Sequence, residues 1–297
     1  MSSVPLPPEI VDYILDTLRD EPKTLRNCCL VAKSWVPRTR KHLFASIKFS
    51  SPKDIELWKK TFPDPSNSPA CHTLTLLVSC PGAVTVADAE EGGWIQAFSH
   101  VLRLDLHCIT AVNNNSTISL APFHGFSHVL KSLHTFFSLS QPQDSQILNL
   151  VPSFPLLENL TLIDHHPLLD DGDDPLVPQA NTPSTSPALT GSLKLVLVRG
   201  LETSARRLLD LPNGLHFREL RFSWFREVDV RWVTELVVRC SHTLECLDVE
   251  NHFRGTSVLV LSWTCNLPRH FQMALVQLPS TSQKRSNSQM SFFAWSL

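Results

Sequence analysis

Residues 157–162 read LENLTL, with leucine at the first, fourth and sixth positions. The same spacing of apolar residues returns at 217–222, FRELRF, and at 244–249, LECLDV. In an extended strand alternate side chains point to the same face, so the last two apolar residues of each segment lie together. A short strand with one apolar face must pack that face against another element. These segments therefore predict a repeated unit in which each copy covers its neighbour.

Shorter apolar alternations continue the series toward the N-terminus. Strands are expected at about 74–78, 102–106, 135–139, 159–163, 193–198, 218–223 and 244–249. Their second apolar position falls at Leu76, Leu106, Leu139, Leu162, Leu197, Phe222 and Val249. Helix candidates lie between them, at 86–99, 144–151, 202–210 and 227–240. Strand and helix repeating at this period predict an α/β fold over 71–255, an irregular leucine-rich-repeat solenoid with a parallel sheet.

The side chains between the core leucines face the other side of the predicted sheet. Solenoids use such faces to bind ligands, and a merely solvated face is the alternative interpretation. The residues that we expect to bind a target protein there are Arg103, Asp105, Lys194, Arg221 and Asp248.

Two segments depart from the repeat. Residues 164–192 hold five Asp and five Pro among Ser and Thr, with no Lys or Arg, which is typical of an acidic, disordered loop. His165 and His166 beside these Asp residues lack the spacing of a calcium loop, so a solvated loop is the preferred interpretation. Residues 256–297 lose the repeat pattern and contain no Asp or Glu. We expect an atypical tail there, with one further strand at 258–263.

Before residue 50 the apolar residues follow a helical period instead. Pro8 and Glu9 suit the first turn of a helix over 5–20, where a missing N–H costs nothing and the helix dipole favours an acid. Further helices are expected from Pro22 and from Ser34. Three short helices bury too little apolar surface to be stable alone, so they must pack on each other or on a partner.

This N-terminal segment resembles an F-box in three places: LPPEIVDYILDTL at 6–18, LRNCCLVAKSW at 25–35 and LF at 43–44. The resemblance implies a three-helix F-box over 1–48. Independently of it, the cap and proline at Ser51 and Pro52 predict a linker helix, and the proline-rich stretch at 63–69 predicts a boundary, together over 49–70. The resemblance also implies docking onto a Skp adaptor and, through the adaptor, onto a cullin. The residues implied to contact the adaptor, or to form the small core behind it, are Leu6, Pro7, Glu9, Ile10, Ile14, Leu15, Leu18, Leu25, Cys28, Leu30, Val31 and Trp35.

Composition limits the classes of function. The 297 residues carry a net charge of −2 and are 42% hydrophobic, so neither nucleic-acid binding nor wholesale disorder is expected. No apolar stretch approaches the ~20 residues of a membrane span, and the N-terminus has no secretory leader, so no membrane partner is expected. The eight cysteines are then expected to be reduced thiols in a cytoplasmic or nuclear protein.

Motifs for catalysis and metal binding are weak. Residues 125–129, GFSHV, end in valine where a nucleophile elbow needs glycine. The cysteines form no C-x-x-C pair, so the spacing of a zinc finger or RING is missing. We therefore expect no catalytic residue, no metal and no cofactor. Substrate recruitment for a Skp–cullin–F-box ubiquitin ligase is the preferred hypothesis. The alternatives are a scaffold that does not engage a cullin and an enzyme of unrecognised type.

Overall fold

A computed structural model describes most of the chain. The described residues are 6–90, 93–108, 120–124, 126, 128–137, 148, 150–164, 189–196, 201–211, 214–223, 229–253, 257–264 and 276–278. The acidic segment between 165 and 188, residues 144–147 and 149 of the helix expected at 144–151, and Gly125 and Ser127 of GFSHV lie outside the described residues.

The described strands form one ten-stranded sheet in chain order. They are β1 (Ser46–Phe49), β2 (Thr75–Val78), β3 (Arg103–Cys108), β4 (Ser132–Phe137), β5 (Asn159–Asp164), β6 (Leu189–Val196), β7 (Leu215–Ser223), β8 (Cys246–Phe253), β9 (Ser257–Thr264) and β10 (Val276–Leu278). The strands from β1 to β8 run parallel, whereas β9 and β10 pair antiparallel. The prediction of parallel strands adjacent in chain order is confirmed for β2 to β8.

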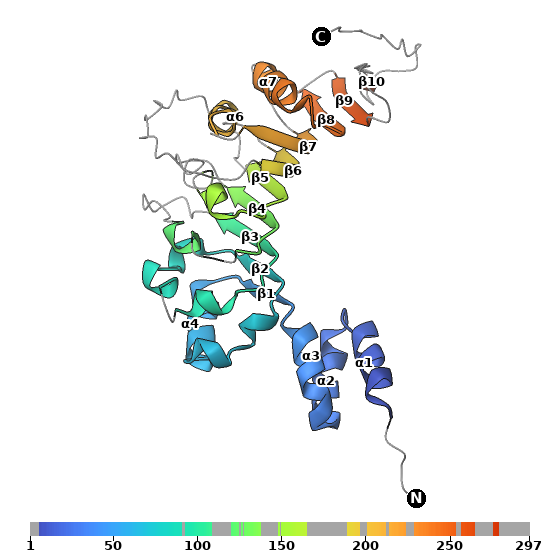
Figure 1. Cartoon of the computed structure of the whole chain (residues 1–297), viewed down its shortest axis with the longest axis vertical. Coiled ribbons are helices and arrows are strands. Elements are labelled where there is room, and N and C mark those ends of the chain that lie inside the picture. The colour runs from blue at the N-terminus through green and yellow to red at the C-terminus, as the bar shows by residue number, and fades with distance from the viewer. Residues whose placement is uncertain are drawn as a thin grey trace, which may run out of the picture.

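Helices and short 3₁₀ turns connect the strands. The α-helices are α1 (Pro8–Thr17), α2 (Pro22–Val31), α3 (Val36–Leu43), α4 (Pro52–Thr61), α6 (Leu201–Leu209) and α7 (Val230–Cys240). The connections lie on one side of a curved sheet, the other side of which is open, and α1 to α3 extend beyond β1 (Figure 1). No helix in the described part of the chain is long and apolar enough to cross a membrane.

Two rows of buried side chains hold the strands together. The first row is Ile47, Leu76, Leu104, Leu133, Leu160, Leu193, Leu220 and Leu247, each paired directly with the next. Its members are 29, 28, 29, 27, 33, 27 and 27 residues apart. The second row lies two positions further along each strand. Burial of a leucine contributes about 1.5–3 kcal/mol, so each strand is stabilised by its neighbours on both sides.

The pairing corrects three expected core positions, the first of which is Leu76: Val78, not Leu76, pairs with Leu106 of β3. Thr135, not Leu139, pairs with Leu162, and Leu195, not Leu197, occupies the same position of β6. These displacements are of two or four residues, and an even shift keeps every side chain on its original face. Alternation alone therefore identifies the face of a strand but cannot locate its ends.

The sheet begins before residue 71, the expected start of the repeat domain. Its first strand, β1, was not predicted from the sequence. Phe49 of β1 packs edge-to-face against Trp58 of α4, with ring centroids 5.7 Å apart, and against Trp94 at 5.3 Å. The residues from 86 to 99 form two 3₁₀ turns, η5 (Val86–Asp88) and η6 (Trp94–Ala97), so the predicted helix is wrong. Consecutive glycines before Trp94 disfavour a continuous helix.

The expected acidic loop over 164–192 is too long at both ends. Asp164 ends β5 and Leu189 begins β6. Leu189 is buried and pairs with Leu215 of β7. Residues 189–192 therefore belong to β6 and not to the loop. The predicted strand at 258–263 is confirmed as β9, and its antiparallel direction ends the parallel repeat.

Candidate functional site

The first candidate surface lies on the N-terminal helical unit, which consists of α1, α2 and α3. Its small core contains Leu15 and Leu25, both 0% exposed. Thr39 is also buried, and its hydroxyl donates to the backbone carbonyl oxygen of Trp35 at 2.7 Å. Leu15 and Leu25 were expected on an adaptor-binding surface, but they are covered by the chain itself. A partner can reach them only if these helices separate.

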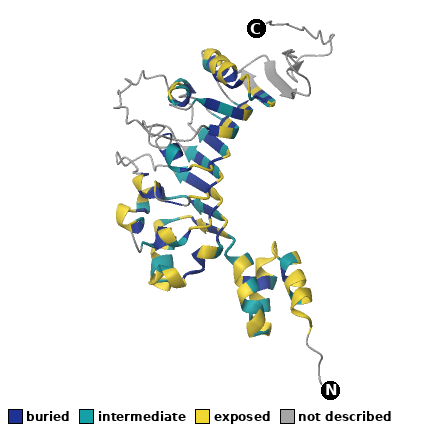
Figure 2. Cartoon of the chain, in the orientation of Figure 1, coloured by how far each residue is buried: buried dark blue, intermediate teal, exposed yellow. Residues whose placement is uncertain are grey.

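Other residues of the expected adaptor set are exposed. Ile10 is 48% exposed and Ile14 is 38% exposed, one helical turn apart on α1, and Leu6 is exposed just before the helix. Leu30 and Val31, at the end of α2, are exposed to 85% and 65%. Much of this unit is exposed in Figure 2. Patches of exposed large apolar side chains are typical of interaction surfaces, so this unit is a candidate for one.

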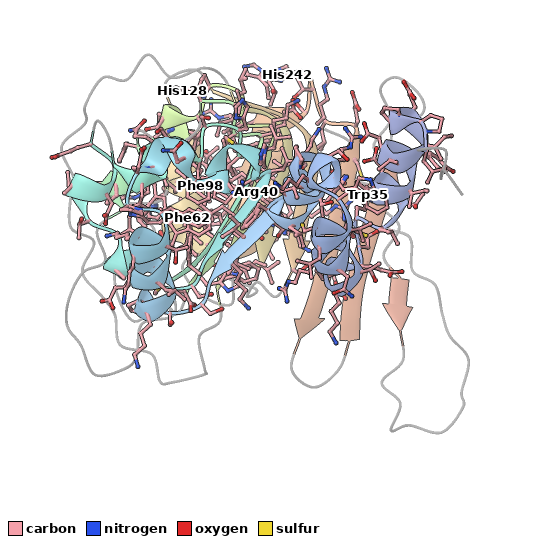
Figure 3. All side chains as sticks on the ribbon, turned by 90° about the horizontal axis from the view of Figure 1, so that it is seen from below. Trp35, Arg40, Phe62, Phe98, His128 and His242 are labelled. Atoms are coloured by element: carbon pink, nitrogen blue, oxygen red, sulfur yellow. The ribbon has the colours of Figure 1, made fainter. Side chains whose placement is uncertain are left out.

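The remaining members of that set lie around this surface. Pro7 and Glu9 are exposed, whereas Leu18, Cys28 and Trp35 are partly buried. Trp35 lies in the turn between α2 and α3, and Figure 3 shows it on the opposite side of the molecule from Phe62 and Phe98. Trp35 and Cys28 therefore present only part of their surface to solvent.

Asp16 joins α1 to α3 through contacts that sequence analysis missed. Its carboxylate accepts hydrogen bonds from Arg38 Nε at 2.7 Å and from Arg38 Nη2, and it lies 2.7 Å from His42 Nε2. The Arg38 guanidinium, and then His42, hold the pKa of Asp16 far below its usual range. Asp16 lies 22 and 26 residues from these partners in the sequence, so no local pattern could reveal the cluster. The effect is to fix the orientation of α1 and of its exposed apolar side chains.

The second candidate surface is the open face of the sheet, which carries three rows of side chains. The polar row includes Ser132, Asn159 and Ser192, whose side chains hydrogen-bond in sequence across three strands at 3.2 and 2.7 Å. The charged row is Lys48, Leu77, Asp105, His134, Thr161, Lys194, Arg221 and Asp248, paired in this order. The apolar row is His107, Phe136, Ile163 and Val196, also paired in order.

The five expected target-binding residues all lie on this face. Asp105, Lys194, Arg221 and Asp248 belong to the charged row, and Arg103 belongs to the neighbouring polar row. Asp105 is only 6% exposed and accepts a hydrogen bond from Arg103 Nε at 2.9 Å. It is therefore placed to orient Arg103 and is too covered to make a broad contact with a ligand.

The charges on the open face are unevenly compensated. Arg221 donates through Nε to Glu219 at 2.8 Å, and Asp248 lies near enough to act on its charge. Lys194 is exposed, and no carboxylate of the described residues lies within ion-pair distance of its ammonium. Burial lowers the pKa of His134, and the nearby cations Arg103 and Lys194 lower it further, against the opposing effect of Asp105.

The apolar row was only partly anticipated. Val196 directly precedes the expected core residue Leu197 and so falls on the predicted open face, whereas His107, Phe136 and Ile163 were missed. His107 lies just beyond the strand expected at 102–106 and Ile163 ends the strand expected at 159–163, whereas Phe136 lies near the start of the strand expected at 135–139. All four side chains are partly exposed, and the rings of His107 and Phe136 are 4.3 Å apart. The pattern could have been found by extending each strand two residues past its core leucines.

No three His, Cys, Asp or Glu side chains of the described residues gather as metal ligands. Burial raises the pKa of Cys240 to about 11 and also raises the pKa of Cys80. A raised pKa disfavours the thiolate that a nucleophilic cysteine needs, so these cysteines behave as apolar packing groups.

Comparison with protein-family models, curated proteins and solved structures found no match to this chain. The helical surface and the open face are therefore the observations that bear on function.

Proposed function

We propose that this chain is a substrate-recruiting subunit of a Skp–cullin–F-box ubiquitin ligase. In this role the N-terminal helical unit binds a Skp adaptor, and the open face of the sheet binds a target protein. The observation that carries the proposal is the exposure of Ile10 and Ile14 on α1, with Leu6 just before the helix. These residues belong to the segment that resembles the start of an F-box.

An adaptor helix packed on these side chains would remove apolar surface from water. Full burial of an isoleucine or leucine contributes about 1.5–3 kcal/mol. The unit has only Leu15 and Leu25 as wholly buried apolar residues, so its own core is small. A partner that covers Ile10 and Ile14 would therefore stabilise the helices as well as bind them.

The period of the sheet supports the repeat part of the proposal. Neighbouring members of the first core row are 27–29 residues apart, except for the 33 residues between Leu160 and Leu193. Leucine-rich repeats have periods of about 20–29 residues. A stack of such repeats is stiff along its length, because each unit packs on the next. It would hold a target at a fixed place relative to the adaptor.

In this arrangement the chain contributes position and the partner proteins contribute chemistry. The cullin would bring a conjugating enzyme whose thioester transfers ubiquitin to a lysine of the target. Holding two reactants together replaces an encounter in solution by a local one, which can account for a large part of a rate enhancement.

Adaptor binding tests the proposal directly. Purified full-length chain is titrated with a recombinant Skp adaptor, alongside the variants Ile10→Glu and Ile14→Glu. We expect binding by the wild type and a loss of more than 100-fold in either variant, because an unpaired carboxylate costs several kcal/mol to bury. Val238→Glu, at an equally exposed position of α7, is the control and should bind normally.

Two results would count against the proposal. Failure of the folded wild-type chain to bind the adaptor would leave a scaffold that does not assemble with a cullin. Normal binding by Ile10→Glu and Ile14→Glu would place the adaptor contact elsewhere on the chain.

A further inference from the structure

We infer that the apolar row and Lys194 form a binding site for an extended peptide segment in which a carboxylate side chain accompanies apolar side chains. The site deepens the proposed function, on which it rests for the identity of its ligand as part of a recruited target protein.

The apolar row has the dimensions of a short peptide. His107, Phe136, Ile163 and Val196 lie side by side on β3 to β6. Adjacent strands are about 4.8 Å apart, so four strands span roughly 14 Å, the length of about four extended residues. All four side chains are partly exposed and therefore leave apolar surface in contact with water. A segment lying across the strands would cover this surface.

The charge beside this row selects the ligand. Lys194 precedes Val196 by two residues on β6, so both side chains lie on the open face, about 6.6 Å apart along the strand. The cations Arg103 and Arg221 already contact the carboxylates of Asp105 and Glu219. Lys194 has no such partner among the described residues. A carboxylate from the ligand would supply one.

A nucleic acid fits this surface poorly. Its binding depends on neutralising several phosphates in succession, whereas Lys194 is the one Lys or Arg on the open face of β3 to β6 without a carboxylate partner among the described residues. The carboxylates of Asp105 and Glu219 on the same face would also repel a phosphate backbone. The combination of Lys194 with a neighbouring apolar row favours a protein segment with mixed acidic and apolar side chains.

Peptide selection tests this site without the adaptor. A random heptapeptide display library is selected on the immobilised full chain, on Lys194→Glu and on Lys60→Glu. Lys60 is an exposed lysine of α4 and serves as the matched control. We expect the wild type and Lys60→Glu to enrich Asp or Glu next to Leu, Ile or Phe. Lys194→Glu should lose this enrichment and favour Lys or Arg instead.

Affinity measurements on the most enriched wild-type peptide complete the test. By fluorescence polarisation, Lys194→Glu should weaken binding at least tenfold and Ile163→Ser at least threefold. Both variants should keep the circular dichroism spectrum and melting temperature of the wild type, which separates loss of the site from loss of the fold.

The outcomes are distinct from those of the adaptor experiment. Selection of basic peptides, absence of any enriched motif, or tighter binding of single-stranded DNA than of the peptide would overturn the site. An unchanged preference in Lys194→Glu would also overturn it. Adaptor binding should be the same in Lys194→Glu and the wild type. Peptide binding by a chain that fails to bind the adaptor would support the site and contradict the ligase role.

Discussion

Gly191 of β6 lies directly against the carbonyl group of Glu158, the residue that precedes β5. A Cβ at position 191 would stand 2.0 Å from that carbonyl oxygen, and the residue has a φ of +88°. The register between β6 and β7 also shifts at this point. Strand β6 can therefore lie this close to Glu158 only because residue 191 has no side chain.

Gly191→Ala is expected to destabilise the chain by about 2–4 kcal/mol, because it combines a left-handed backbone with a steric clash. Gly214→Ala is the matched control: its φ is +71°, but the nearest atom to an added Cβ is 3.9 Å away. It should cost only about 1 kcal/mol. Urea unfolding followed by circular dichroism measures both. Equal effects would show that the contact with Glu158 is unimportant.

The helical unit should distinguish core from surface positions. Leu15→Ala is expected to cost about 2–5 kcal/mol, the usual range for a wholly buried leucine. Ile14→Ala, at the adjacent exposed position, should cost less than about 1 kcal/mol. Thermal unfolding measures the difference. Adaptor binding should weaken in both variants, but only Leu15→Ala should also shift the unfolding transition. A similar stability of the two variants would contradict the observed packing.

The Asp16 cluster predicts a dependence of α1 on acidity. Because Arg38 and His42 lower the pKa of Asp16 in the folded chain, ionised Asp16 stabilises the fold. This contribution is complete above about pH 4, the usual range of an aspartate, and is lost as the pH falls toward the lowered folded-state pKa. The protection of the α1 amides from hydrogen exchange, measured relative to their intrinsic exchange rates, should therefore fall from pH 4 to pH 2.5. The fall should be larger than in Asp16→Asn. Parallel profiles for the two proteins would argue against the cluster.

His134 predicts a pH effect in a different range. Burial lowers its pKa, so the unfolded chain binds more protons than the folded chain just below the usual histidine pKa of about 6.5. The contribution of His134 to stability should therefore fall as the pH is lowered from 7 through 6. Urea unfolding at pH 7.5, 6.5 and 5.5 tests this, with His134→Gln as the comparison. The substitution should flatten the slope, and an unaltered slope would refute this role of His134.

The sequence alone determined the parallel sheet, because alternation at a period of two records which face of each strand is buried. The predicted core residues Leu106, Leu162, Phe222 and Val249 are all buried in the second row, as expected of apolar side chains that no single repeat can cover by itself. The sequence also predicted the helices at the N-terminus, where Pro8 and the apolar stripe act within one or two turns. These signals are local, so they can be read without knowing what packs on them.

Only the tertiary structure decided which apolar residues stay exposed. Ile14 and Leu15 belong to the same stripe of α1, yet only Leu15 is wholly covered, and this depends on helices formed later in the chain. Asp16 finds Arg38 and His42 in the same way, across the fold. Likewise, Lys194 has no carboxylate partner among the described residues, whereas Asp105 and Glu219 on the same face pair with Arg103 and Arg221. Such properties belong to pairs of distant residues, and a one-dimensional pattern contains no record of their distances.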